Sequence, residues 1–424
     1  MSLWKHNYEM LCTLWHSTKG FAATYASPLV MCLVFAQVSD RAIIVYGLLL
    51  PYLLLGFAIA EGTEMAIFYL IGRQSQTNIV ALFAWQASLA LMYYAGGFLY
   101  QPGGVTTFEM TLIARPLFIM AALSIASAGC IGILRARGAF RRIYRANFAF
   151  LCITIGMAIW CALHDLLDTS TWAHTMAYVA VLESIVWFLL LQPWHRALWR
   201  CTLQGHSLHL YSRFSIPLIL SWSVVALDRH WLNGIVGQWD TAYVGVFAGW
   251  FQLKPFFLIP ALALGQVLAQ RRQHDHAMFH WSHIRPISPA LFLWIGMTVF
   301  LAYRVFTHVE QILSLCTPHL EDAVHALTIV IWTDAALIPF MGGMHVSRYL
   351  LESDQKGYVV AAIFAAAMIV ARGFLQLTAH HASMPLLITS FLLHAAIVMM
   401  IPIYLGLRLT HNRVFLAHAT TAAH

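Results

Sequence analysis

Six ionisable residues interrupt long apolar stretches of the sequence: Glu61, Glu64, Arg115, Lys254, Asp334 and Arg372. A charge in such surroundings is costly unless it faces water, a partner or a ligand, so each one invites a functional interpretation. The three cations are predicted to line a hydrated cavity and attract an anionic substrate. The three acids are predicted to balance those charges, or to bind and release a coupling proton or sodium ion. No catalytic residue and no cofactor is predicted.

The alternative for the same residues is buried acid–base pairing between helices, with no further role. Glu61 and Glu64 lie one helical turn apart and share a face, and Lys254 is followed by Pro255. Both interpretations stay open for the six residues. For Glu183 the pairing alternative is favoured. For His394 a hydrogen bond between helices is favoured, because a single histidine in an apolar segment commonly serves packing.

The composition explains why these charges stand out. Of 424 residues, 60% are hydrophobic and only 10% are charged, and the mean hydropathy is +0.72. A soluble domain carries about a quarter charged residues. These values exclude a soluble enzyme, a nucleic-acid-binding domain and a disordered chain, and they indicate an all-α protein that crosses a membrane many times. Seven cysteines are scattered without a CxxC pair, so neither a disulfide framework nor a zinc-finger pattern is predicted.

Twelve apolar segments are long enough to cross a bilayer as helices. They are predicted near 21–39, 43–72, 78–99, 110–134, 147–163, 171–192, 215–232, 241–269, 289–304, 324–345, 357–378 and 383–407. The predicted organisation is a cytoplasmic amphipathic segment over 1–20, a six-helix bundle over 21–192 and a basic cytoplasmic linker over 193–214. A second six-helix bundle over 215–407 and a cytoplasmic tail over 408–424 follow.

Basic residues set the predicted orientation. With the N-terminus in the cytoplasm, 18 of the 24 Lys and Arg residues fall in cytoplasmic segments, and only Arg41, Arg229 and Arg304 fall on the opposite side. The chain is therefore predicted to be a multi-pass membrane protein with both termini in the cytoplasm. The net charge of +7 is then a topology signal. Membrane lipids are expected partners, and nucleic acid is not.

The two halves share a spaced pattern of a proline, an Asp-Arg pair, a glycine and a basic cluster. It begins at Pro28, Asp40, Gly47 and Arg73 in the first half and at Pro217, Asp228, Gly245 and Arg271 in the second. The step from glycine to arginine is 26 residues in both. Because each half has an even number of spans, both run in the same direction. This predicts a pseudo-two-fold axis along the membrane normal, with a central pathway between the halves.

A histidine cluster lies between His274 and His283. His276, His280 and His283 share a helical face, which is a geometry that zinc can use. The chain has 22 histidines, so a chance cluster on an interfacial amphipathic segment is favoured, and no metal site is predicted. The GxSxG, HExxH and P-loop motifs do not occur in the sequence. Any transport would therefore draw on an ion gradient or on the gradient of the substrate itself.

Two stretches of the second half resemble the MOP exporter superfamily. One reads Asp228-Arg-His-Trp-Leu-Asn-Gly-Ile-Val-Gly, then Thr241-Ala-Tyr-Val-Gly-Val-Phe-Ala and Gln252-Leu, and is similar to helices seven and eight of the polysaccharide-transporter branch. The other has Ile331-Trp-Thr-Asp334, Met341-Gly-Gly-Met and Ser347-Arg-Tyr before Lys356, and is similar to the tenth helix and following loop of that branch. The residue-level match is confined to 228–273 and 321–360.

The resemblance implies two helical bundles in a V that work by alternating access. The polysaccharide branch flips undecaprenyl-pyrophosphate-linked oligosaccharides across the bacterial inner membrane. The sister branch, the MATE antiporters, exports drugs and small metabolites with protons or sodium. Asp334 falls on a helix where both branches can carry a functional acid. The first half departs from the pattern, because it has Glu61 and Glu64 where a glycine-rich pattern is usual, and this leaves the substrate class open.

The leading prediction is a flippase for a lipid-linked oligosaccharide or polysaccharide precursor, whose pyrophosphate would bind the three cations. The alternative is a MATE-like antiporter for a small metabolite, siderophore or drug, with the three acids carrying the coupling ion. An acyltransferase or glycan polymerase is disfavoured, because the longest predicted outer segment, 305–323, is short. A scaffold protein would leave the charges within the spans unexplained. The sequence gives no signal for an oligomeric state.

Overall fold

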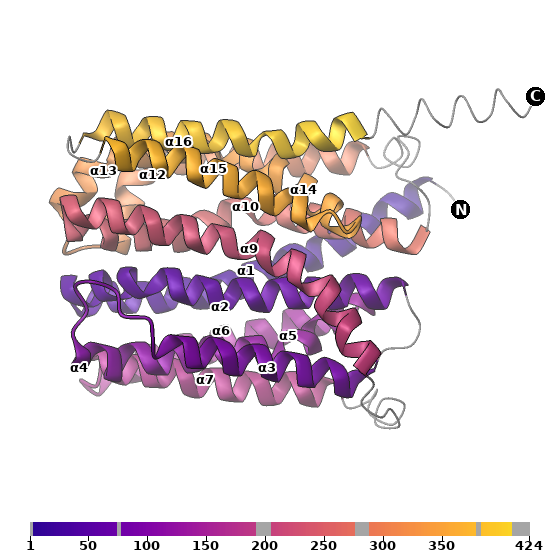
Figure 1. Ribbon diagram of the computed structural model, residues 1–424, viewed down its shortest axis with the longest axis horizontal. Helices are drawn as coiled ribbons and strands as arrows, with labels where there is room; N and C mark the ends of the chain where they lie inside the picture. Colours follow the sequence, from indigo (N-terminus) through magenta and orange to yellow (C-terminus); the bar gives the residue numbers. More distant parts are fainter. Residues whose placement is uncertain (1–2, 74–77, 192–204, 276–287, 379–382, 409–424) are drawn as a thin grey trace, which may run out of the picture.

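The computed structural model describes residues 3–73, 78–191, 205–275, 288–378 and 383–408. Over these ranges the chain is built of long helices in two bundles and has no strand (Figure 1). Nine helices in the described ranges are long and apolar enough to cross a membrane, or ten spans if one bent pair is counted. Each of the twelve predicted spans falls on a helix or on consecutive helices. The prediction of an all-α membrane fold is confirmed.

Most of the first bundle occupies the lower half of Figure 1. Its apolar segments are helical, and a helix satisfies its backbone hydrogen bonds internally, as a membrane requires. It contains α1 (Leu3–Val38), α2 (Asp40–Arg73), α3 (Ile79–Gly97), α4 (Thr107–Glu109), the π-helical turn η1 (Met110–Ala114), α5 (Arg115–Ala136), α6 (Phe140–Leu163) and α7 (Thr169–Leu190).

Most of the second bundle occupies the upper half of Figure 1. It contains α9 (Gly205–Trp239), α10 (Thr241–Asp275), α12 (Ser288–Cys316), α13 (Glu321–Ala336), α14 (Ile338–Ser353), α15 (Gly357–Leu377) and α16 (Met384–Val398). A single predicted span corresponds to α13 and α14, which are bent by 47° at a break that precedes Pro339. A proline in this position cannot continue the hydrogen-bond ladder of α13, which accounts for the break.

Some predicted boundaries differ from the observed ones. The segment 1–20 is not separate, because α1 runs without a break from Leu3 into the first span. The second half of the predicted linker belongs to α9, while residues 192–204 and 409–424 lie outside the described residues. The predicted outer segment 305–323 is largely helical, since α12 continues to Cys316 and α13 begins at Glu321.

The two bundles pack in corresponding ways. In the first, α1 lies against α6 and α2 against α5; in the second, α9 lies against α15 and α10 against α14. Between the bundles, α1 contacts α10 as α9 contacts α2. This correspondence fits the predicted pseudo-two-fold axis. The Asp-Arg part of the sequence repeat is not structurally equivalent, however, because Asp40 begins α2 whereas Asp228 lies inside α9. The residue at the matching helix junction is Asp240.

Two glycines of the repeat do occupy related places, where α2 meets α10. A Cβ atom on Gly47 would lie 2.7 Å from the backbone oxygen of Val244, and one on Gly245 would lie 3.4 Å from Ile44. The side-chain amide of Asn233 also donates to the Gly47 oxygen at 3.0 Å. Small residues let helix backbones approach this closely in a membrane. The bundles are therefore in tight contact near the predicted outer end.

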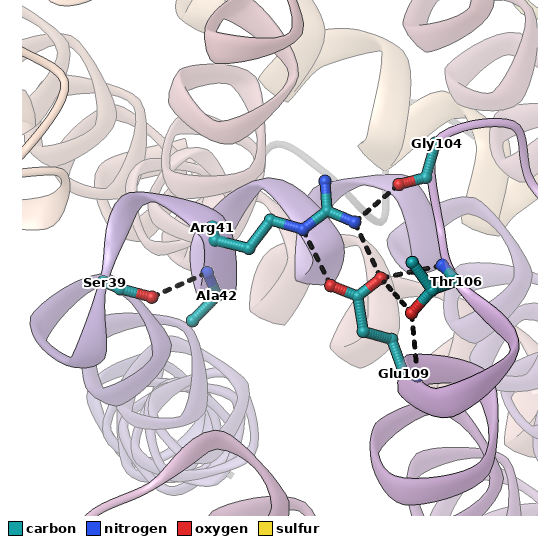
Figure 2. A network of polar contacts seen from close by, with 6 residues as sticks. All are labelled: Ser39, Arg41, Ala42, Gly104, Thr106 and Glu109. Carbon is teal, nitrogen blue, oxygen red and sulfur yellow. Dashed lines mark hydrogen bonds and ion pairs between the residues drawn. The ribbon is translucent and has the colours of Figure 1, made fainter.

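Side-chain caps organise the predicted outer end of the first bundle. Thr106 and Glu109 form a reciprocal capping box at the start of α4 (Figure 2). Arg41 at the start of α2 donates from Nε and Nη2 to the two Glu109 oxygens at 2.7 Å, and from Nη2 to the Gly104 oxygen at 2.7 Å. The loop before α4 is thereby fastened to α2.

Asp168 caps α7. Its Oδ1 accepts hydrogen bonds from the backbone N–H groups of Ser170 at 2.8 Å and Thr171 at 2.9 Å. Partial burial alone would raise the pKa of this carboxyl group, but the hydrogen bonds from Thr171 and Ser170 favour the charged form. Together they lower the pKa of Asp168 below its ordinary value.

Candidate functional site

A cavity of about 430 Å³ lies between the bundles. Helices α1, α2, α5, α6 and α7 line it from the first bundle, and α9, α10 and α13 to α16 line it from the second. Most of its wall is apolar and aromatic. The lining includes five of the six predicted site residues: Glu61, Glu64, Lys254, Asp334 and Arg372.

Lys254 and Asp334 form a buried ion pair. Lys254 Nζ lies 2.8 Å from Asp334 Oδ1 and 2.7 Å from Oδ2, and the indole nitrogen of Trp250 donates to Oδ2 at 2.7 Å. Trp250 and Lys254 are one turn apart on α10, so both can reach the carboxylate on α13. Both charged groups are more than nine-tenths buried. The pair joins one predicted substrate-binding residue to one predicted ion-coupling residue.

Arg372 forms a second buried pair, with Asp228. Arg372 Nε and Nη2 donate to the two carboxylate oxygens at 2.8 and 2.9 Å, and Nη1 donates to Ser390 Oγ at 2.8 Å. The Nδ1 atom of His394 lies 3.6 Å from Asp228 Oδ1. The forked geometry is the strong form of an arginine–carboxylate contact. In the sequence Asp228 belongs to the repeat and to the stretch that carries the family resemblance, and neither pattern indicated this partner 144 residues away.

Arg229 lines the cavity, although the predicted orientation assigned it to the side of the membrane opposite the cytoplasm. Its guanidinium carbon lies 3.4 Å from the centre of the Phe251 ring. Its Nη1 atom is buried and makes no hydrogen bond within the described part of the chain. A guanidinium over an aromatic face is stabilised by the ring quadrupole but keeps its hydrogen-bonding capacity. The predicted span 215–232 ends only three residues after Arg229, whereas α9 continues to Trp239 and so brings Arg229 inside the bundle.

Glu61 and Glu64 lie in a different polar cluster, with Arg135. Glu64 Oε1 is 2.6 Å from Arg135 Nε, and Glu61 Oε1 is 3.8 Å from Arg135 Nη1. The predicted orientation assigned Arg135 to a cytoplasmic segment between two spans. It lies instead in the last turn of α5, where it is buried and reaches α2. The two glutamates are therefore separated from Asp334, which has Lys254 as its partner.

The same end of the molecule has polar contacts that cross between the bundles. The Tyr69 hydroxyl donates to the Tyr349 backbone oxygen at 3.2 Å, and Ser17 Oγ lies 2.8 Å from the Gln266 side-chain amide. Next to them, Arg348 and Glu352 form an ion pair at 2.8 Å on α14. Together with the glycine crossing of α2 and α10, these contacts hold the bundles together at both ends of the cavity.

Arg115 is not brought to the cavity, contrary to the prediction. It lies beside a smaller pocket of about 100 Å³, with its guanidinium carbon 5.3 Å from the centre of the Phe98 ring. The prediction used only the depth of Arg115 along its helix. Depth does not determine the direction of a side chain, and this one lies on the exposed face of α5.

The charges around the cavity differ between the bundles. The first bundle contributes three carboxylates, Glu61, Glu64 and Glu183, and one cation, Arg135. The second contributes two carboxylates, Asp228 and Asp334, and three cations, Arg229, Lys254 and Arg372. Glu183, for which pairing between helices was favoured, instead accepts a hydrogen bond from Trp187 Nε1 at 3.2 Å within its own helix.

The histidine cluster between His274 and His283 falls mostly outside the part of the chain that the structure describes, because residues 276–287 lie outside it. Among the residues that are described, no group of three or more His, Cys, Asp and Glu is placed to hold a metal ion.

Comparisons with known proteins identify the fold. No protein-family model matches the chain, and neither does any curated protein. Several solved structures do match over nearly the whole chain. A mutant of the Vibrio cholerae MATE transporter VcmN is 16% identical, has a TM-score of 0.76 and is matched over 97% of this chain and 98% of its own.

Two further structures agree. A MOP superfamily transporter from Pyrococcus furiosus, described as having a binding pocket of reverse polarity, is 14% identical with a TM-score of 0.69, over 95% of this chain and 96% of its own. A MATE structure in complex with MaL6 is 14% identical with a TM-score of 0.73, over 96% of each chain. The chain therefore has the fold of MATE transporters in the MOP superfamily.

Proposed function

We propose that this protein is a secondary exporter of the MATE type, which carries a small organic solute out of the cytoplasm across a bacterial inner membrane. The observation that carries the proposal is the cavity of about 430 Å³, whose wall is shared by both bundles. Rocking of one bundle against the other would open such a cavity to each side of the membrane in turn. Its volume is within the range of sites for drug-sized ligands.

Asp334 is proposed as the coupling group. Its carboxylate is held at once by Lys254 and by Trp250, so a proton or a cation that binds there must compete with Lys254. Such competition couples the occupancy of one charge site to the release of another, as antiport requires. Protonation of Asp334 would also free Lys254 to bind an acidic group of the solute. Of the three predicted ion-coupling acids, Glu61 and Glu64 are proposed to contribute less, because they lie against Arg135 at the predicted cytoplasmic end.

The test is proton-coupled transport in inverted membrane vesicles. With a pH-sensitive dye inside, solutes from a panel of cationic, anionic and neutral aromatic compounds should release protons from vesicles that contain the protein. Asp334→Asn should abolish the release, whereas Glu310→Gln, at an exposed position of α12, should leave it unchanged. Replacing sodium by choline in the same vesicles distinguishes sodium coupling. Transport that persists in Asp334→Asn would remove Asp334 from the mechanism.

Flipping of a lipid-linked oligosaccharide is the second candidate. It is favoured by Arg229, whose Nη1 atom has no hydrogen-bond partner among the described residues, and by the three cations of the second bundle. Against it, Lys254 and Arg372 already have buried carboxylate partners, and Arg115 lies elsewhere. A pyrophosphate would have to displace two well-formed ion pairs. Glycan export that is lost in Lys254→Ala and Arg229→Gln, with no response of the vesicles to small solutes, would favour this candidate.

A further inference from the structure

The pocket beside Arg115 is distinct from the cavity and has no place in the proposed transport cycle. Its wall is formed by the end of α3, the loop after it, η1 and the start of α5. The polar groups there include Arg115, Gln101, Thr107 and Thr111. Its volume of about 100 Å³ is too small for a drug-sized solute but suits a single compact group.

Arg115 is a cation without a protein counter-charge. It makes no ion pair within the described part of the chain. Its guanidinium carbon lies 5.3 Å from the centre of the Phe98 ring. The nearest acid along the helix is Glu109, and both of its carboxylate oxygens already accept hydrogen bonds from other residues. It accepts from Arg41 Nε and Nη2 at 2.7 Å and from the backbone and hydroxyl of Thr106 at 2.7 and 2.9 Å (Figure 2).

The side chain of Arg115 is long enough to reach the depth of lipid headgroups. The unit Thr107–Ala136 has 30 residues, which is about 45 Å at 1.5 Å per residue and close to the full thickness of a bilayer with its polar layers. Arg115 begins about 12 Å along this unit from the predicted outer end. A long arginine side chain extends toward the interface from such a position, which brings its guanidinium to the level of the phosphates.

The surroundings of the pocket are apolar and face outward. Leu99 is 87% exposed, Phe108 72% and Phe98 51%. Exposed side chains of this kind on a membrane helix contact lipid, so the group that enters the pocket arrives from the bilayer. A soluble anion would have to pass between these side chains.

We propose that the pocket binds the phosphate of an anionic phospholipid from the outer leaflet, with Arg115 as the charged partner. A guanidinium can donate two parallel hydrogen bonds to one phosphate group. The hydroxyls of Thr107 and Thr111 and the amide of Gln101 surround the same pocket. The π-helical turn η1, in which the Arg115 N–H bonds to the Met110 oxygen, sets where Arg115 leaves the helix. The bound lipid would lie against α3 and α5, outside the cavity.

The test is photo-cross-linking of the full-length protein in nanodiscs. Phosphatidylglycerol and phosphatidylcholine probes should carry the same photoreactive group at the start of one acyl chain. We expect the phosphatidylglycerol probe to label peptides that cover residues 94–118 more strongly than the phosphatidylcholine probe. Arg115→Gln should reduce that labelling about fivefold, which is the effect of one basic residue near an anionic membrane surface. Arg115→Lys should keep most of it.

Arg304→Gln is the matched control, because Arg304 is another exposed arginine on the predicted outer side, on α12. It should not change labelling of 94–118. Equal labelling by the two probes, no labelling of this segment, or an unchanged yield in Arg115→Gln would overturn the proposal. Suppression of labelling by inorganic phosphate would instead assign the pocket to a free anion and reject a lipid. If Arg115→Gln does not fold, the wild-type comparison of probes and phosphate decides.

Discussion

At the scale of single residues, most of the charged side chains that line the cavity form ion pairs. These ion pairs determine which side chains are free to bind a further group. Lys254 and Arg372 were predicted as independent cations for an anionic substrate, but each has a bidentate carboxylate partner. Asp228 and Arg229 are neighbours in sequence and have different roles, since one is fully engaged by Arg372 and the other lies over Phe251. A ligand of the proposed site would therefore have to compete with existing contacts at Lys254, whereas at Arg229 it would add a contact.

Removing one member of the Lys254–Asp334 pair should destabilise the protein. We expect Lys254→Ala to lower the free energy of unfolding by about 3–5 kcal/mol, because Asp334 is left buried and charged without its partner. The double variant Lys254→Met with Asp334→Leu should recover most of that loss while transport stays absent. Thermal unfolding in detergent measures the first effect and vesicle transport the second. Arg304→Ala serves as the control, with a change within about 0.5 kcal/mol. A double variant no more stable than the single one would mean that the pair is not the cause.

At the scale of elements, the contact between α2 and α10 depends on the absence of a side chain at Gly47. Gly47→Ala should lower the free energy of unfolding by about 1–3 kcal/mol, because the new Cβ would meet the Val244 backbone oxygen and the two helices would have to separate. Gly343→Ala on α14 is the matched control. Its Cβ would meet nothing within 4 Å, so it should stabilise its helix by up to about 1 kcal/mol. Similar changes in both variants would contradict the tight crossing.

The α7 cap makes a pH-dependent contribution to stability. Asp168→Ala should cost about 1 kcal/mol near pH 7 through loss of the cap. Because the folded state lowers the pKa of Asp168, its contribution is present above the unfolded pKa of about 3.9 and disappears as the pH falls through the folded value. The difference in unfolding temperature between wild type and Asp168→Ala should therefore be constant from about pH 7 to 5 and shrink below about pH 4. A difference that grows in acid would have the wrong sign.

At the scale of the whole molecule, two similar bundles meet at both ends of a shared cavity. The outer contact is a crossing of α2 and α10 backbones. At the other end polar side chains of α1, α2, α10 and α14 meet, and α2 also approaches α9 closely, since a Cβ atom on Gly62 would lie 2.7 Å from the Ile219 backbone. Hydrogen bonds such as that between Ser17 and Gln266 are readily exchanged for water. The contact between α1 and α10 at the predicted cytoplasmic end is one that a movement of the bundles would have to break.

Linking the bundles at that end should stop transport. In a background without reactive cysteines, Ser17→Cys with Gln266→Cys, joined by a short bismaleimide, should reduce export to the level of empty vesicles, because α1 could no longer move away from α10. The control pair, Trp231→Cys with Gln376→Cys, lies within the second bundle, where the indole nitrogen of Trp231 donates to Gln376 at 3.2 Å. Joining that pair should leave export intact. Full transport after linking the bundles would exclude relative movement at this contact.

The sequence by itself determined the class of the molecule and the positions of its spans. The reason is that the length and hydrophobicity of a segment, which are local properties, determine whether it can cross a bilayer as a helix. It also singled out Lys254, Asp334 and Arg372, since charges in apolar segments are visible without any fold. Only the tertiary structure decided which charges meet. Lys254 and Asp334 are 80 residues apart in the chain, and Arg372 and Asp228 are 144 apart. Arg115 was grouped with Lys254 and Arg372 because it too is a cation in an apolar segment, but the rotation of its helix turned it away from the cavity. Helix rotation and helix neighbours depend on packing between distant segments, and no local pattern in one sequence records them.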